Sequence, residues 1–300
     1  MKQLVILSGK GGTGKTSVAA AFAHLAAEGF RSKSAVLADV DVDAANLELV
    51  LTPRVIDRED FRGGQIAVID QAACDGCGNC AAVCRFDAIF TTDGLYQVDP
   101  IACDGCAACV YQCPVDAISM HEQVVGQWFR SESRYGPLFH AALRPAQENS
   151  GKLVTMVKQR ARLLAMDEGY DLVLVDGPPG IGCPVISATS GADLALIVAE
   201  PTAAGVHDMQ RILQTTEHFG VRSLVCINKA DLYPEGSAEI ELFCHEHGID
   251  LVGRIPYDAS VTEAMVQGEP VTAFRPRSPA SQALRAIWGN VLEELEEVPA

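Results

Sequence analysis

The stretch GKGGTGKT at residues 9–16 constrains the fold of this chain more than any other part of the sequence. It follows the apolar run LVIL and precedes an alanine-rich segment that ends near Gly29. It also fits the pattern G-x-x-x-x-G-K-[ST], in which glycines let backbone N–H groups surround phosphate oxygens at the positive end of a helix. We therefore expect a strand, a phosphate-binding loop and a helix. A chance glycine loop is the alternative, and the flanking strand and helix patterns argue against it.

The residues of this loop are the candidate nucleotide site. Lys15 is expected to reach the β and γ phosphates, and the Thr16 hydroxyl is expected to bind Mg²⁺. The other contacts to phosphate are expected from Gly9, Lys10, Gly11, Gly12, Thr13 and Gly14.

Lys10 is a second lysine in the loop, which a single nucleotide does not require. With it, GKGGTGKT resembles the deviant loop of the MinD/ParA class of ATPases, which includes the Mrp-type cluster carriers and the nitrogenase iron protein. The resemblance implies slow ATP hydrolysis and a dimer, either a homodimer or a heterodimer with a related ATPase. It assigns Lys10 to the partner's nucleotide across the dimer interface. Without the resemblance, Lys10 is equally explained as a solvated loop lysine.

Two further segments match the switches of that class. SAVLADVDVDAANLELV (34–50) is a strand that ends in clustered carboxylates, which would repel one another without a cation nearby. By resemblance, Asp41 orients the attacking water, Asp39 supports the magnesium shell, and Asn46 also belongs to the site. In YDLVLVDGPPGIG (170–182), Asp176 ends a buried strand and matches the outer-shell magnesium ligand of the second switch.

The segment LVCINKAD (224–231) addresses the base of the nucleotide. Family members read adenine with an asparagine at the position of Asn228, although N-K-x-D also occurs in guanine-specific GTPases. We expect ATP rather than GTP.

The fold class expected for residues 1–56 and 146–300 is α/β. Helical segments alternate with apolar runs at 4–8, 35–39, 172–176, 194–199, 223–227 and 251–255. This alternation predicts a mostly parallel sheet covered by helices on both faces.

A duplicated cysteine run lies between those two stretches. CDGCGNCAAVCRFDAI (74–89) and CDGCAACVYQCPVDAI (103–118) align without a gap and share nine of sixteen positions. Each has the C-x₂-C-x₂-C-x₃-C spacing of bacterial two-cluster ferredoxins, in which the fourth cysteine of each run ligates the other cluster. The spacing thus assigns one 4Fe–4S cluster to Cys74, Cys77, Cys80 and Cys113. It assigns a second to Cys103, Cys106, Cys109 and Cys84.

The resulting hypothesis is a small α+β ferredoxin-like domain at 57–120, followed by a hairpin at 121–145 that returns to the ATPase core. Arg85 departs from the ferredoxin pattern, which has proline after the fourth cysteine, as at Pro114. Two Cys₄ zinc sites are the alternative, but three closely spaced cysteines with a remote fourth favour clusters. The segment holds ten acidic residues and three arginines, so a redox partner is expected to present a basic face.

Cys183 lies shortly after Asp176 in the sequence, just beyond the second switch. A cysteine at this offset helps to bridge one cluster between two subunits in the nitrogenase iron protein. The rest of that local pattern is missing from GPPGIGCPV, so Cys183 is a candidate ligand by resemblance only.

Composition excludes some partners. A formal net charge of −16 disfavours binding to nucleic acid, which needs clustered lysine and arginine. The glutamate-rich end ALRAIWGNVLEELEEVPA would be repelled by anionic lipid, so no membrane partner is expected. The amino terminus lacks a signal-peptide core, and a cytoplasmic location is expected. Eleven cysteines in a reducing compartment then indicate metal or redox chemistry.

Three functions fit these features. The first is an ATPase whose nucleotide state gates electron transfer to or from a redox partner. The second is an ATP-dependent assembly or carrier protein for iron–sulfur or related metal cofactors. The third, a MinD/ParA-like positioning ATPase acting on membrane or DNA, is the weakest because of the charge.

Overall fold

The computed structural model describes residues 1–29, 35–144 and 150–298. Contacts within the chain define two compact units. The first comprises residues 1–58, 128–142 and those from 150 onward, and the second consists mainly of 59–127. The expected boundary between residues 145 and 146 lies outside the described residues.

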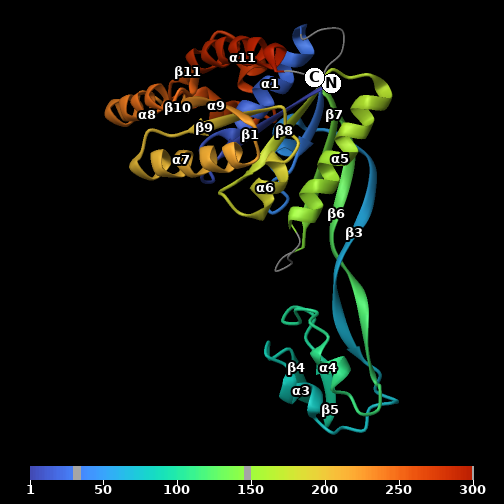
Figure 1. Cartoon of the computed structure of the whole chain (residues 1–300). Helices are drawn as coiled ribbons and strands as arrows, with labels where there is room; N and C mark the ends of the chain where they lie inside the picture. The colour runs from blue at the N-terminus through green and yellow to red at the C-terminus, as the bar shows by residue number, and fades with distance from the viewer. Residues whose placement is uncertain (30–34, 145–149, 299–300) are drawn as a thin grey trace. The chain divides into compact units, whose positions relative to one another are not determined.

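The first unit is built around the larger of two sheets. Its strands are β1 (Lys2–Ser8), β2 (Val36–Asp39), β7 (Gly136–Leu143), β8 (Leu172–Pro179), β9 (Leu194–Ala199), β10 (Arg222–Asn228) and β11 (Asp250–Ile255). Its helices are α1 (Lys15–Gly29), α2 (Leu47–Leu51), α5 (Ser150–Glu168), α6 (Cys183–Thr189), α7 (Ala203–His218), α8 (Pro234–Glu246), α9 (Ala259–Val266), α10 (Val271–Phe274) and α11 (Pro279–Glu297). Two longer strands, β3 (Arg54–Ile69) and β6 (Ile118–Ser133), belong partly to each unit (Figure 1).

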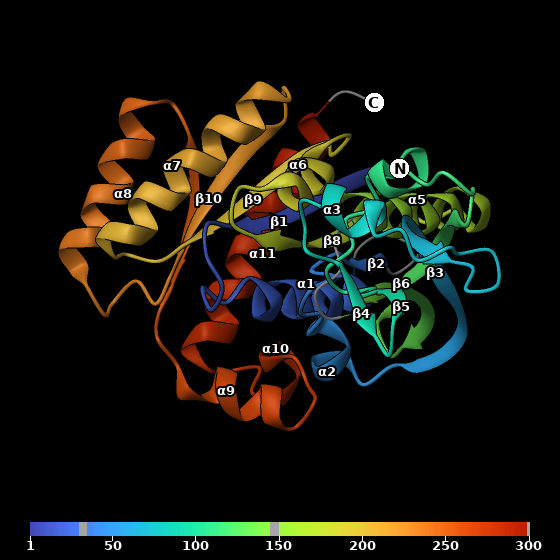
Figure 2. The ribbon, with the colours of Figure 1, turned by 90° about the horizontal axis from the view of Figure 1, so that it is seen from below.

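The strands of this sheet follow the order β11-β10-β9-β1-β8-β2-β7-β6-β3. Every pair from β11 to β7 is parallel. Figure 2 shows the parallel strands between two layers of helices, with α5 to α8 on one face and α1, α2 and α9 to α11 on the other. The α/β fold with a mostly parallel sheet, expected from the sequence, is confirmed.

The parallel strands are largely apolar because helices cover both faces of the sheet. Residues 4–7 and 194–198 are at most 1 % exposed because helices pack on both sides of them. On one face, the small side chains of Ala19, Ala20, Ala21 and Ala23 bring α1 close to the sheet. Phe22 of the same helix packs on Trp288 of α11 with 4.7 Å between ring centroids. Because the strands are parallel, the loops after β1, β2, β8 and β10 all leave from the same edge of the sheet, where α/β proteins bind ligands.

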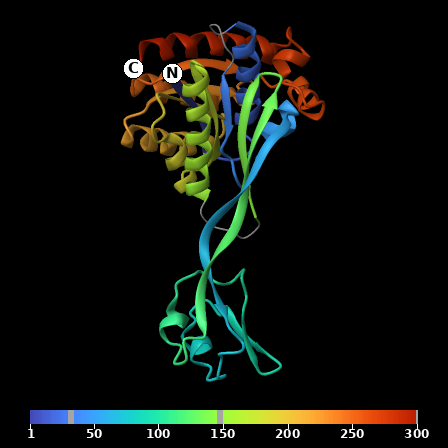
Figure 3. The same ribbon diagram turned by 90° about the vertical axis from the view of Figure 1, so that its right-hand side faces the viewer.

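The second unit is small and has few apolar residues in its core. It contains the short helices α3 (Asn79–Val83) and α4 (Ala108–Tyr111), the β4–β5 hairpin (Ile89–Thr92 and Leu95–Val98), and parts of β3 and β6, which run side by side in Figure 3. Its buried cluster consists of Ala67, Ile69, Cys80, Cys109 and Ile118. Cysteines thus occupy positions that leucine or isoleucine would fill in an ordinary core.

None of the helices in the described residues has both the length and the apolar character that a membrane span requires.

Candidate nucleotide site and cysteine cavities

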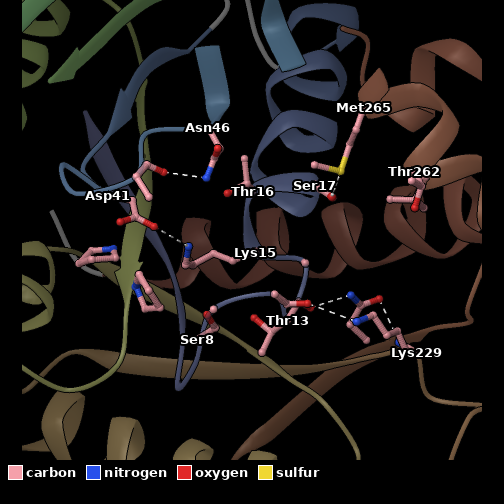
Figure 4. A pocket seen from close by; sticks show the side chains of 18 of the residues that line it. Ser8, Thr13, Lys15, Thr16, Ser17, Asp41, Asn46, Lys229, Thr262 and Met265 are labelled. Atoms are coloured by element: carbon pink, nitrogen blue, oxygen red, sulfur yellow. Dashed lines mark hydrogen bonds and ion pairs between the residues drawn. The ribbon is translucent and has the colours of Figure 1, made fainter. Parts of the chain in front are cut away.

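A cavity of about 650 Å³ lies over the phosphate-loop sequence. This volume is within the range of small-molecule sites. Its walls include loop residues Gly11–Thr16, the turn after β2 with Asp41, Asp43 and Asn46, and the segment Pro256–Met265 around α9. Figure 4 shows Lys15 and Asp41 pointing toward each other, with Thr13 and Lys229 grouped beside them.

Lys15 begins α1 and is 5 % exposed. Its ammonium lies 4.0 Å from Asp41 Oδ2 and 3.6 Å from Asp176 Oδ1. Burial raises the pKa of Asp41 to about 6, and Lys15 offsets part of that rise. The loop therefore joins a buried cation to Asp41, which follows β2, and to Asp176, which lies within β8 rather than at its end as expected.

Asp39 organises the turn that carries Asp41. Its carboxylate accepts hydrogen bonds from the backbone N–H groups of Asp41 (3.1 Å), Asn46 (3.0 Å) and Leu47 (2.9 Å). The side chain is completely buried, and it pairs with Asp176 in the register of β2 and β8. Burial and the neighbouring Asp176 carboxylate hold the pKa of Asp39 well above its usual value, despite the three amide donors.

The Asp176 carboxylate fits a magnesium site. It is completely buried, and apart from the Lys15 ammonium at 3.6 Å, neither of its oxygens has a hydrogen-bond partner within 3.5 Å among the described residues. A buried carboxylate is costly unless hydrogen bonds, a cation or a proton neutralise it, and here Lys15 is shared with Asp41. Mg²⁺ keeps several waters and takes one or two carboxylates together with substrate phosphates. Asp176 and Thr16 would hold such an ion, with the Thr16 hydroxyl on the cavity wall.

In the N-K-x-D segment, Asn228 and Lys229 contact the phosphate loop and line the cavity, whereas Asp231 is not among the described residues that line it. Asn228 Nδ2 donates to the Thr13 carbonyl (2.7 Å), and Asn228 Oδ1 accepts from the Lys229 N–H (3.0 Å). A Cβ at Gly14, which has φ +91°, would lie 2.2 Å from Asn228 Nδ2. Asp231 Oδ1 instead accepts from the Tyr257 N–H (2.6 Å), and Asp231 is not one of the described residues that line the cavity.

Lys10 and Gly9 lie outside this cavity lining. Lys10 Nζ is 2.9 Å from Glu200 Oε2, just beyond β9. A Cβ at Gly9 would lie 2.1 Å from Asp208 Cβ on α7, so glycine is required for that close approach. Sequence reasoning missed Glu200, Tyr257 and Met265. An acidic residue directly after the buried strand 194–199 was the available signal for Glu200.

In the second unit, the eight cysteines line two separate cavities. One is lined by Cys74, Cys77, Cys80 and Cys113, together with Tyr96 and other residues. The other is lined by Cys103, Cys106, Cys109 and Cys84. Each cavity therefore brings together three cysteines of one run and the last cysteine of the other.

Backbone hydrogen bonds explain this exchange. The Asp70 N–H donates to the Ala117 carbonyl (2.8 Å), and the N–H of Asp99, the equivalent residue of the second run, donates to the Ala88 carbonyl (2.7 Å). The residues just before each cysteine run are thus hydrogen-bonded to the residues just after the last cysteine of the other run. In addition, the Ala117 N–H donates to Cys113 Sγ at 3.2 Å.

The repeat is also visible in backbone conformation. Left-handed φ values recur at equivalent positions of the two runs, at Gly76 and Gly105 (+75° and +73°), at Gly78 and Ala107 (+79° and +60°), and at Asp87 and Asp116 (+51° and +53°). These turns bend the backbone around each cavity. Of Gly76 and Gly105, only Gly105 has no room for a side chain, since a Cβ there would lie 2.3 Å from the Gln65 carbonyl oxygen.

The cysteines surround their cavities and do not meet at a point. Throughout the described residues, no three His, Cys, Asp or Glu side chains are grouped to hold a metal ion. All eleven cysteines are free thiols. Burial raises the pKa of Cys80 and of Cys109, so their thiolates need a nearby positive charge.

Cys183 is an exposed residue in the first unit. It begins α6, directly after the glycine and proline turn that follows Asp176. It does not line the nucleotide cavity, although the adjacent Pro184 does. Cys226 and Cys244 are buried.

Comparison with known proteins agrees with this geometry. The family model of the CobQ/CobB/MinD/ParA nucleotide-binding domain matches residues 4–271. An uncharacterized protein of Methanocaldococcus jannaschii is 36% identical over 233 residues, which cover 76% of this chain and 78% of that protein. The iron–sulfur cluster carrier protein of Pyrococcus furiosus is 24% identical over 162 residues, 49% of this chain and 54% of that protein.

Among solved structures, the septum site-determining protein MinD of Pyrococcus horikoshii, complexed with Mg-ADP, has the same fold. The TM-score is 0.59 with 18% identity, over 100% of this chain and 98% of that chain. The phosphate loop, the carboxylates beside it and the order of the strands agree with the family match. The chain belongs to the CobQ/CobB/MinD/ParA family of nucleotide-binding proteins.

Proposed function

We propose that the chain hydrolyses Mg-ATP to ADP and phosphate, and that its nucleotide state gates electron transfer through two 4Fe–4S clusters to or from a partner protein. The observation that carries this proposal is the sorting of eight cysteines into two four-cysteine cavities, each with one cysteine from the other run. That sorting is the ligand pattern of two-cluster ferredoxins.

The nucleotide half of the proposal is supported by the buried charges. Lys15 would contact the β and γ phosphates, and the buried Asp176 carboxylate and Thr16 would hold Mg²⁺. Asp41, with its raised pKa, would orient the attacking water from the opposite wall. Lys10 would act on the nucleotide of a second subunit in a homodimer or a heterodimer.

Adenine is favoured over guanine by the position of Asp231. A guanine-reading carboxylate must accept hydrogen bonds from the base, but one oxygen of Asp231 is taken by the Tyr257 N–H, and Asp231 is not among the described residues that line the cavity. Asn228 uses one amide hydrogen for the Thr13 carbonyl of the loop and its own carbonyl for the Lys229 N–H, which leaves one N–H for a base. ATP is therefore the proposed nucleotide.

The cluster half is supported by the shape and chemistry of the cavities. A tetrahedral zinc site requires four sulfurs about 2.3 Å from one point, whereas these cysteines line cavities and are not grouped around an ion among the described residues. Three closely spaced cysteines with a fourth from the other run are the ligand pattern of a 4Fe–4S cluster. The second unit also lacks disulfides among its described residues and has a small apolar core, and domains of this size usually need such support.

When bound, the clusters would supply one-electron transfer, and this chain's residues would control access to them. N–H donors to cysteine sulfur, such as that of Ala117, help to set the potential. Ten acidic residues against three arginines in 57–120 favour a redox partner with a basic surface.

Paired substitutions test the cluster proposal. With crossed ligation, Cys84→Ser and Cys106→Ser damage the same cluster, so the double variant should keep about four irons of about eight per chain. The matched control, Cys84→Ser with Cys77→Ser, should lose iron from both. Anaerobic iron and sulfide analysis distinguishes the two. Two zinc ions without acid-labile sulfide, or the reverse pattern of loss, would refute crossed clusters.

A second function is ATP-dependent assembly or delivery of iron–sulfur or related metal centres. It is favoured by the similarity to the iron–sulfur cluster carrier protein, although that match covers about half of each chain. The exposed Cys183 beside the second switch is the residue that could hold a transferable cluster between subunits. Rapid ATP-dependent transfer of iron to an acceptor apoprotein, lost in Cys183→Ser, would support delivery over electron transfer.

A further inference from the structure

Glu200, directly after β9, binds two lysines from different loops. Its Oε2 lies 2.9 Å from Lys10 Nζ, and its Oε1 lies 2.5 Å from Lys229 Nζ. Lys229 Nζ also donates to the Gly12 carbonyl (3.2 Å). One carboxylate thus connects the first lysine of the phosphate loop to the lysine after β10.

The Glu200 carboxylate is ionised and is held by two ion pairs. Its side chain is 11 % exposed, and each oxygen has its own ammonium partner. Burial acts to raise the pKa of Glu200, but hydrogen bonds and charge from Lys229 and Lys10 outweigh it and hold the pKa below its usual value. Glu200 is therefore ionised at neutral pH.

The two lysines differ in how firmly they are held. Lys229 has a second acceptor in the loop and a wall position in the cavity. Lys10 is 37 % exposed and does not line the cavity among the described residues, so Glu200 directs it away from its own nucleotide site. Any phosphate that recruits Lys10 must compete with Glu200 for the same ammonium group.

We infer that Glu200 is a positioning residue that holds Lys10 in a resting position and opposes its recruitment by the nucleotide of a second copy of this chain. The inference rests on the proposed function, which gives Lys10 that target. Because an ion pair resists a weakly charged competitor better than a strongly charged one, Glu200 favours ATP over ADP as the nucleotide that releases Lys10. It thereby sets the nucleotide concentration at which the dimer forms.

The test is the dimerisation of the full chain, purified anaerobically, as a non-hydrolysable ATP analogue is added with Mg²⁺. Light scattering gives the midpoint. Glu200→Gln keeps the size of the side chain but removes its charge, and it should lower the midpoint about three- to tenfold, as expected for a partly exposed ion pair. It should also permit some dimer with ADP.

Lys229→Gln is the matched control. It leaves Lys10 as the only cation bound to Glu200 among the described residues, so it should raise the midpoint. Because Lys229 also lines the cavity, binding of the analogue by the monomer is measured for this variant too. A general disturbance of the loop would move both variants in the same direction. In a Lys10→Ala background, Glu200→Gln should have no effect on dimerisation, because the group it restrains is gone.

The inference is overturned if Glu200→Gln leaves or raises the midpoint, or if its effect persists without Lys10. It is also overturned if neither wild type nor Glu200→Gln dimerises with the analogue. Binding of the analogue by wild-type monomer, measured by calorimetry in the same samples, decides separately on the nucleotide half of the proposed function.

Discussion

At the scale of residues, the nucleotide site depends on buried charges that the fold forces together. Asp39 and Asp176 lie in adjacent parallel strands, Asp41 follows the first of them, and Lys15 is a cation within 4.0 Å of Asp41 and Asp176. The phosphate-loop motif indicated Lys15, and the resemblance to the MinD/ParA class indicated the three aspartates; their roles remain predictions. The Lys10–Glu200 contact was not predictable, because it depends on the register between β1 and β9 and on a side chain from a distant part of the chain.

Lys15 and Asp41 are expected to have separable roles. Lys15→Ala should abolish tight nucleotide binding, because a buried ammonium that faces the phosphates is lost. Asp41→Ala should bind ATP but hydrolyse it about 10²- to 10⁴-fold more slowly, since water would no longer be oriented. Binding by calorimetry and phosphate release measure the two effects. Equal hydrolysis by wild type and Asp41→Ala would show that the role is misassigned.

At the scale of elements, six strands of the parallel sheet were predicted close to their observed bounds, because each is a short apolar run between turn signals. The long strand β3 was not predicted. Most of its residues are exposed, so its sequence lacks the apolar alternation that marks a half-buried strand. Likewise, the parallel pairing of β7 with β2 depends on contacts between segments far apart in the chain, which local sequence does not encode.

The turns around the cavities allow a matched comparison between the two halves of the repeat. Gly76 and Gly105 have nearly the same left-handed φ, so alanine at either costs about 1 kcal/mol of backbone strain. At Gly105 the new Cβ would also overlap the Gln65 carbonyl oxygen of β3, whereas at Gly76 it would meet no atom within 4 Å. Gly105→Ala should therefore release iron at a markedly lower urea concentration than Gly76→Ala. Equal sensitivity would contradict the packing of Gly105 against β3.

At the scale of the whole molecule, the chain connects the nucleotide site to the cysteine unit through two strands. β3 begins at Arg54, shortly after α2, whose first turn is fixed by Asp39. β6 returns from the second cysteine run and continues into β7, which pairs with β2. Both connections thus start or end beside elements that would contact nucleotide phosphates. We propose that a change at Asp41 or Asp39 on binding ATP acts on both strands, and this is the physical basis of the proposed gating.

The reduction potentials of the bound clusters, measured with ADP and with a non-hydrolysable ATP analogue, test this account most directly. Linkage is reciprocal, so a nucleotide that shifts the potential must bind oxidised and reduced protein with different affinity. For a one-electron couple, a shift of about 59 mV corresponds to a tenfold ratio of affinities. The account predicts different potentials in the two nucleotide states, a matching difference in nucleotide affinity, and no shift in Lys15→Ala. Potentials and affinities that are the same in every state would contradict gated electron transfer.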